Sequence, residues 1–163
     1  MARPDRSLRI VPSVLDRLID DHPEQSHEPA ESRFYDVSEQ KKSVARDLEE
    51  LLNSRQEALW ELPPEFAAVR KSLPLYGLPD FSSYNLLSPD DRNRLQRAIE
   101  NTIASFEQRL RRVRVTMDLP SEKDRALRFK VEALLRVDPI PEPVTFDTVL
   151  HLSTQEYSVQ DKD

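Results

Sequence analysis

Cysteine is absent from this 163-residue chain, and glycine occurs once, at Gly77. Without cysteine the protein has no disulfide, no thiol nucleophile and no thiolate metal site, which suits a reducing compartment. A single glycine cannot build a glycine-rich loop that cradles a phosphate. Near the start, the apolar run Leu8–Pro12 is too short for a signal peptide or a membrane span. These absences predict a cytoplasmic protein without membrane insertion.

The composition limits the size of the core. Hydrophobic residues make up 37% of the chain and charged residues 33%, and there are thirteen prolines. The length suits one domain of the common size of about 100–150 residues. The low hydrophobic content and the many prolines predict that part of the chain is unpacked or is stabilised by partners. We therefore expect a component of a larger assembly.

The net charge of −6 disfavours nucleic-acid binding, because that affinity comes mostly from neutralised phosphates. One segment of opposite charge lies between positions 92 and 114, where seven arginines accompany Glu100 and Glu107, a surplus of five positive charges. The arginines are Arg92, Arg94, Arg97, Arg109, Arg111, Arg112 and Arg114. This segment predicts a partner with an acidic face, and the alternative is a solvated helix surface.

The N-terminal region predicts a docking segment that a flexible linker joins to the domain. Apolar residues at positions 14, 15, 18 and 19 have the spacing of a short amphipathic helix. Residues 20–32 are polar and contain two prolines, which is typical of a linker. Such a segment gains little by packing on its own domain, so we expect Leu15 and Leu18 to attach to a neighbouring protein; the alternative is a simple tail. We assign residues 1–33 to this segment and linker, and residues 34–160 to the domain.

Two helices are predicted in the domain. The first begins at Ser38, whose hydroxyl can cap the free amides, and continues toward Leu59 with its leucines in the core and its charged face in solvent. The second begins at Ser88, which precedes a proline and two aspartates, and its apolar stripe ends at Phe106. The loop between them holds Gly77, where the backbone needs unusual freedom, and flanking aromatic residues that we expect to plug the core.

Three strands are predicted at the end of the chain, where apolar residues alternate over 112–119, 127–136 and 144–152. Two helices on one face of an antiparallel meander form a stable two-layer arrangement. The sequence thus predicts an α+β fold with two main helices packed on a three-stranded antiparallel sheet, preceded by the N-terminal amphipathic segment and the flexible linker. Such a sheet keeps open edges, which can receive a strand from another subunit.

The junction at residues 106–110 runs directly from the second helix into the first strand. Glu107 and Arg109 cannot share a helix face, but at a turn both can point outward to meet a partner's charges or backbone. The junction therefore predicts a protein-binding site at Glu107, Arg109 and Leu110, with Arg112 and Arg114 on the following strand. The alternative is a solvated surface pair that contributes little.

Enzymatic chemistry is not predicted. The three histidines, His22, His27 and His151, have no second ligand-type residue at metal-binding spacing, and His151 has no nucleophile elbow with it. A carboxylate pair such as Glu107 and Asp118 could cleave a glycosidic bond only in a substrate cleft with one carboxyl held protonated. We predict no catalytic residue, no metal site and no cofactor.

Four segments carry a family resemblance: residues 14–18, 46–55, 76–81 and 106–110. Together they resemble TssE, the baseplate subunit of type VI secretion systems, which is similar to the small wedge proteins of contractile phage tails. The resemblance extends from about residue 10 to the final strand. The family's Glu-Pro-Arg motif stands here as Glu107-Gln108-Arg109. Loss of the proline removes a fixed backbone angle, so we expect a less rigid junction.

The resemblance implies a non-enzymatic adaptor. The Glu and Arg of the motif would engage the TssF–TssG wedge, and the sheet would offer an edge on which the first ring of the TssB–TssC sheath is laid. TssK is an additional candidate neighbour, and the expected location is the cytoplasmic base of the secretion apparatus. Two alternatives remain open: a peptidoglycan hydrolase, since some relatives carry a lysozyme-like label, and an unrelated cytoplasmic scaffold whose basic helix binds an acidic protein.

Overall fold

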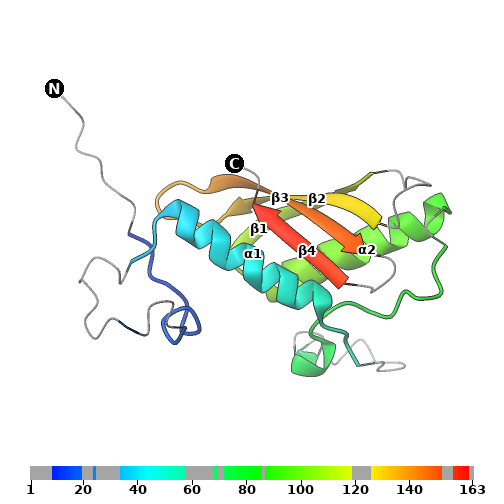
Figure 1. The fold of residues 1–163 in the computed structure, drawn as a ribbon, viewed down its shortest axis with the longest axis horizontal. Coiled ribbons are helices and arrows are strands. Elements are labelled where there is room, and N and C mark those ends of the chain that lie inside the picture. The colour runs from blue at the N-terminus through cyan, green and yellow to red at the C-terminus, as the bar shows by residue number, and fades with distance from the viewer. Residues whose placement is uncertain are drawn as a thin grey trace.

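A computed structural model describes most of the chain. The described residues are 9–19, 24, 34–57, 68–69, 72–85, 87–118, 126–151 and 156–161. Two helices, α1 and α2, are followed by four strands, β1 to β4, which form one antiparallel sheet (Figure 1). The predicted α+β class and the two helices are confirmed.

Helix α1 spans Val37–Asn53 and begins with a capping box. The amide of Glu39 donates to Asp36 Oδ1 at 2.8 Å, and the amide of Asp36 donates to Glu39 Oε2 at 2.8 Å. Each side chain thus pairs an amide that the first helical turn leaves free, so Asp36 is the cap and the predicted start at Ser38 is wrong. The helix ends before Ser54, which is extended, and Leu59 lies outside the described residues.

Helix α2 spans Pro89–Phe106 and begins where the sequence predicts. Proline at the first helical position and Asp90 and Asp91 in the first turn favour this start. The hydroxyl of Ser88 makes no capping hydrogen bond, so that part of the prediction is wrong. The buried residues are Leu95, Ile99, Thr102 and Ile103, which lie on one stripe.

The sheet has four strands rather than the predicted three. In space they follow their chain order, each pairing antiparallel with the next. Their bounds are Leu110–Met117 for β1, Ala126–Leu135 for β2, Glu142–His151 for β3 and Glu156–Asp161 for β4. Strand β4 buries only Tyr157 and Val159, and two apolar positions are too few to reveal an alternating pattern.

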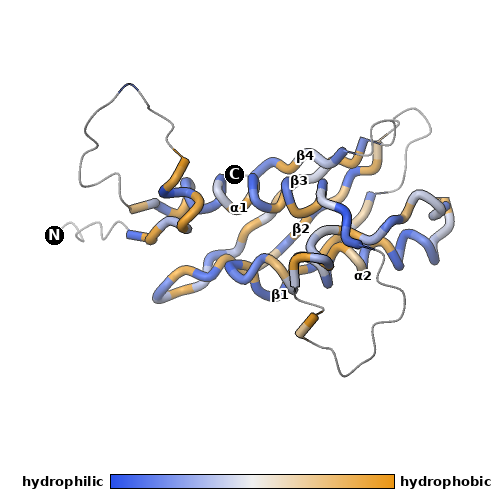
Figure 2. The backbone as a smooth tube through the Cα atoms, turned by 90° about the horizontal axis from the view of Figure 1, so that it is seen from below, coloured by the Kyte–Doolittle hydropathy of each residue, from blue (hydrophilic) through white to orange (hydrophobic). Residues whose placement is uncertain are grey.

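One face of the sheet forms the core. Buried residues alternate with exposed ones along β2 and with half-buried ones along β3, and hydrophobic and hydrophilic colours follow one another along β2 in Figure 2. Helix α1 packs beside β4 and helix α2 beside β1, so the helices share the apolar face between them. The opposite face carries exposed polar residues such as Arg128 and Lys130. This is the two-layer arrangement that the sequence predicts.

The loop that crosses from α1 to α2 is tied to the end of α1 at Gly77. This residue has a φ of +103°, a left-handed conformation that glycine adopts without strain. The amide of Leu78 donates to the Ser54 carbonyl at 2.9 Å, and the amide of Gln56 donates to the Leu78 carbonyl at 3.1 Å. The aromatic side chains of the loop pack against the core, as predicted: Tyr76, Phe81 and Tyr84.

Candidate docking site

The junction between α2 and β1 is held by its own backbone. Glu107 caps the end of α2, and its carbonyl accepts from the amide of Leu110 at 3.2 Å. The carbonyl of Arg109 accepts from the amide of Arg136 at 2.7 Å. The amide of Arg109 donates to Glu107 Oε1 at 3.0 Å. These hydrogen bonds restrain the backbone at Gln108, which stands where the family's Glu-Pro-Arg motif has proline.

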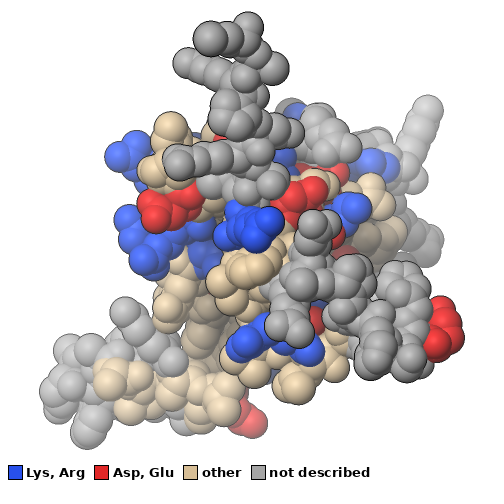
Figure 3. Space-filling model, turned by 90° about the vertical axis from the view of Figure 1, so that its left-hand side faces the viewer, with Lys and Arg blue, Asp and Glu red and all other residues tan. Residues whose placement is uncertain are grey.

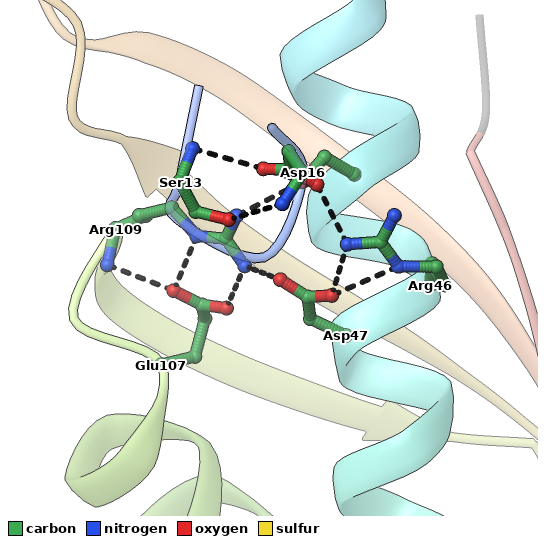
Figure 4. Close-up of polar contacts among 7 residues, drawn as sticks. Ser13, Asp16, Arg46, Asp47, Glu107 and Arg109 are labelled. Carbon is green, nitrogen blue, oxygen red and sulfur yellow. Dashed lines mark hydrogen bonds and ion pairs between the residues drawn. The ribbon is translucent and has the colours of Figure 1, made fainter. Parts of the chain in front are cut away.

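The guanidinium of Arg109 points toward α1 (Figure 4). Its Nε donates to Glu107 Oε1 at 2.8 Å, and its Nη1 donates to the Ser43 hydroxyl at 3.1 Å. Its Nη2 donates to both Glu107 Oε2 and Asp47 Oδ2. Burial alone would lower the pKa of Arg109, but the hydrogen bonds and charges of Glu107 and Asp47 raise it above the ordinary value. Arg109 therefore ties the junction to the middle of α1.

The expectation that both charged residues of the motif point outward is wrong for Glu107, which is 7% exposed. Leu110 is also buried, in the core cluster, so its side chain is not available to a partner in this fold. The side chain of Arg109 keeps 23% of its surface exposed. Of the three residues predicted to bind a partner at this junction, only Arg109 has a side chain that a partner can contact.

A second anchor lies in residues 13–19, here named the hook. Asp16 has a fully buried side chain, although its neighbours in the sequence are exposed. Its carboxylate accepts from the amide of Ser13 at 3.0 Å, from the Ser43 hydroxyl at 2.9 Å and from Arg46 Nη2 at 2.7 Å. The hook thus contacts its own domain through a polar residue, contrary to the expectation that it gains little by such packing.

Arg46 and Asp47 connect the hook to the junction. Arg46 Nη2 donates to Asp16 Oδ1 and to Asp47 Oδ1, both at 2.7 Å, while Asp47 Oδ2 accepts from Arg109. Figure 4 shows the alternating chain of charges across one side of α1. We call this set the charge network: Asp16, Arg46, Asp47, Glu107 and Arg109. The sequence shows no sign of Asp16 and Asp47 as site residues and predicts Arg46 on the solvated face of the first helix, because no local pattern marks residues so far apart in sequence as neighbours.

The apolar side chains of the hook are exposed. Leu15 is 49% exposed and Leu18 is 76% exposed, and Val14 and Ile19 are exposed too, as is Val11 just before the hook. Figure 3 views the end of the molecule that carries the hook, where uncharged surface lies between basic side chains. The binding of Leu15 and Leu18 to a neighbour stays a prediction, and the structure leaves both side chains accessible for it.

Arg112 and Arg114 lie apart from the charge network. Both are exposed on β1, and the register of β1 on β2 shifts between Arg111 and Arg114. Arg112 has a φ of +54°, as expected for a residue at a β-bulge. The predicted binding residues therefore fall into two groups, one around α1 and one along the outer edge of the sheet.

The buried carboxylate of Asp16 makes part of the stability pH-dependent. Burial raises its pKa, but hydrogen bonds from Ser13, Arg46 and Ser43 outweigh that effect and lower it from 3.8 to about 2. The ionised form is the bonded form, so its contribution of about 2 kcal/mol is complete above pH 4 and is lost as the pH falls toward 2. In urea unfolding, the free energies of unfolding of the native chain and of Asp16→Asn should differ by this amount at pH 6. The two values should converge near pH 2.

Asp118→Asn provides the control for this measurement, because Asp118 is exposed. It should change the free energy of unfolding by no more than about 0.5 kcal/mol at pH 6. A difference between the native chain and Asp16→Asn that stays constant from pH 6 to pH 2 would contradict the proposed role of the carboxylate.

Comparison with known proteins identifies the family. Residues 38–140 match the family described as Baseplate wedge protein gp25, and the chain belongs to this family. TssE is the type VI secretion homologue of phage gp25, so the family resemblance found in the sequence is confirmed. Searches of the curated proteins and of the solved structures returned no match. Neither helix in the described part of the chain is long and apolar enough to cross a bilayer.

Proposed function

We propose that this protein is a structural component of a type VI secretion baseplate, at the cytoplasmic base of the apparatus. It docks on the TssF–TssG wedge and anchors the TssB–TssC sheath by accepting a strand at its sheet. The family match carries the proposal, since it spans most of α1, the whole of α2, the junction and the first two strands. The family is defined by baseplate wedge proteins, and the partners are our proposal.

The charge network supports a single docking surface made of the hook and the junction. It contains two guanidinium groups and three carboxylates, so its members almost neutralise one another. Side chains that are already paired on α1 lose little conformational freedom when a partner arrives. The partner would then contact the exposed leucines of the hook and the accessible part of Arg109, while Glu107 holds Arg109 in position.

The orientation of Glu107 favours this role over a peptidoglycan hydrolase. Both oxygens of its carboxylate accept hydrogen bonds from Arg109, and the side chain is buried beside α1. The acid of a glycosidase must instead face the scissile bond in a cleft that admits the substrate. Glu107 is used here to fix the junction.

Replacing both hook leucines, Leu15→Asp with Leu18→Asp, should lower recovery of the full chain with co-expressed TssF and TssG by roughly tenfold or more. The charged side chains cannot occupy an apolar partner surface without losing their hydration. The unfolding free energy should change by no more than about 1 kcal/mol, because Leu18 is mostly exposed and Leu15 is half-exposed. Affinity purification followed by quantification of the bound chain measures the recovery.

The matched control is Leu73→Asp with Ile140→Asp, since these side chains are 86% and 73% exposed and lie outside the hook. This variant should be recovered like the native chain. Full recovery of the hook variant would overturn docking through the hook, and equal loss in both variants would show a nonspecific effect of added charge.

A further inference from the structure

The two edges of the sheet differ in how their backbone groups are used. On β4, the amide of Tyr157 donates to Asn53 Oδ1 at 2.8 Å, and its carbonyl accepts from Asn53 Nδ2 at 2.9 Å. The amide of Val159 donates to Glu49 Oε2 at 2.9 Å. Two side chains of α1 therefore occupy the edge of β4. A strand from another protein would have to displace both of them to pair there.

The edge of β1 is less completely occupied. In an antiparallel pair, alternate residues direct their backbone groups toward the partner strand and away from it. The amide of Asp118 donates to the Arg128 carbonyl on β2, so Val115 and Met117 direct their backbone groups outward. One of these groups, the amide of Val115, donates to Glu100 Oε1 at 2.8 Å. A single carboxylate on α2 thus caps this amide.

An open groove follows this edge. It has a volume of about 430 Å³ and is lined by Gln96 and Glu100 of α2 and by residues 113–117 of β1. The cavity beside β4, which Asn53 and Tyr157 help to line, holds only about 20 Å³. The β1 edge therefore has room for another polypeptide along the strand, and the cavity at β4 does not.

The charge around the groove indicates what could enter it. Arg111, Arg112 and Arg114 are exposed on β1, and Arg128 and Lys130 are exposed on β2. On the open face of the sheet, Thr116 lies opposite Lys130 and Arg114 lies opposite Glu132. The carboxylate of Glu132 partly offsets the positive charge of these residues. An incoming strand beside β1 would place alternate side chains next to Arg114 on this face, where carboxylates are favoured.

The bulge sets the length of the pairing segment. Arg112 and Val113 together stand opposite Ala133, and the left-handed backbone at Arg112 turns the strand there. Regular pairing is therefore available over residues 113–117, beyond the bulge. Val113 and Met117 pack against the core and line the groove together with Gln96 and Glu100 of α2. The other side chains of an incoming strand would therefore meet a wall of mixed polarity, which favours small uncharged residues.

We propose that the outer edge of β1 receives an extended strand of a partner protein, of about five residues, with small uncharged side chains toward α2 and acidic side chains toward Arg114. Glu100 occupies the amide of Val115 until the partner's carbonyl replaces it. This inference rests on the proposed strand-accepting function and specifies its edge. A peptide backbone fits the outward amides and carbonyls better than a nucleic acid does, because Glu100 repels phosphate groups inside the groove.

The test titrates the ¹⁵N-labelled full chain with a peptide of about seven residues in which valine alternates with glutamate. Amide resonances of residues 113–117 should shift on binding, and those of β4 should not. Glu100→Ala should bind the peptide roughly tenfold more tightly, because the competing hydrogen bond is gone. Glu49→Ala removes the equivalent cap on β4 and should leave the affinity unchanged.

A peptide with lysine in place of glutamate should bind more weakly, in keeping with the basic surface. Absence of shifts at 113–117 in both the native chain and Glu100→Ala would overturn the proposal, as would shifts confined to β4. Shifts that grow with protein concentration alone, or that appear only with a single-stranded oligothymidylate, would assign the edge to a second copy or to nucleic acid instead. If the peptide binds but the chain is not recovered with TssF and TssG, the strand site at β1 stands and docking on the wedge is refuted. If the chain is recovered with TssF and TssG but the peptide does not bind, only the strand site at β1 is refuted.

Discussion

Arg109→Ala is expected to lower the free energy of unfolding by roughly 2–4 kcal/mol. The substitution removes every side-chain donor that Arg109 directs at Glu107, Asp47 and Ser43, and leaves only its backbone amide on Glu107. It leaves the carboxylate of Glu107 almost buried without its counter-ion, and such a charge costs more than the lost hydrogen bonds alone. Urea unfolding of the full chain at neutral pH, followed by circular dichroism, measures the loss.

Arg111→Ala is the matched control, because Arg111 is two positions away and exposed. It should change the free energy of unfolding by no more than about 0.5 kcal/mol. The free energy of unfolding of Arg109→Lys should lie between those of Arg109→Ala and Arg111→Ala, since lysine restores the charge but not the planar, forked donors. Equal stability of Arg109→Ala and Arg111→Ala would mean that the motif is the solvated surface pair considered as the alternative.

The fold could be predicted from the sequence wherever a pattern repeats several times. The long alternation of β2 and β3 and the start of α2 at a Ser-Pro-Asp-Asp segment each provide several agreeing signals. Strand β4 provides only two apolar residues, and its stability comes from pairing with β3 and from side chains of α1. Such support from distant residues has no trace in local periodicity.

The site was harder to predict than the fold, because its interactions join distant parts of the chain. Glu107 and Arg109 could be selected as site residues because they lie between a helix and a strand. Their orientation, however, depends on Asp47, which precedes Glu107 by sixty positions. Asp16 stands among exposed apolar residues and resembles any surface aspartate in sequence. A buried position for it follows only once the hook lies against Ser43 and Arg46.

The loop at Gly77 shows how closely one backbone position is packed. A Cβ atom added there would lie 2.2 Å from the carbonyl oxygen of Ser54 and 2.5 Å from its carbonyl carbon. Ser54 cannot simply move away, because its amide donates to the Glu50 carbonyl at the end of α1, at 3.0 Å. The same carbonyl oxygen of Ser54 accepts from the amide of Leu78. Any larger residue at this position must therefore separate the loop from α1.

Gly77→Ala is accordingly expected to lower the free energy of unfolding by roughly 3 kcal/mol, from left-handed strain at alanine and from hydrogen bonds lost between the loop and α1. Ser83→Ala, at an exposed position later in the same loop, should change it by no more than about 0.5 kcal/mol. Urea unfolding measures both values, and amide exchange at Gln56 and Leu78 should accelerate in Gly77→Ala alone. A variant as stable as the native chain would contradict the close approach of Gly77 to Ser54, because that contact leaves no space for a methyl group.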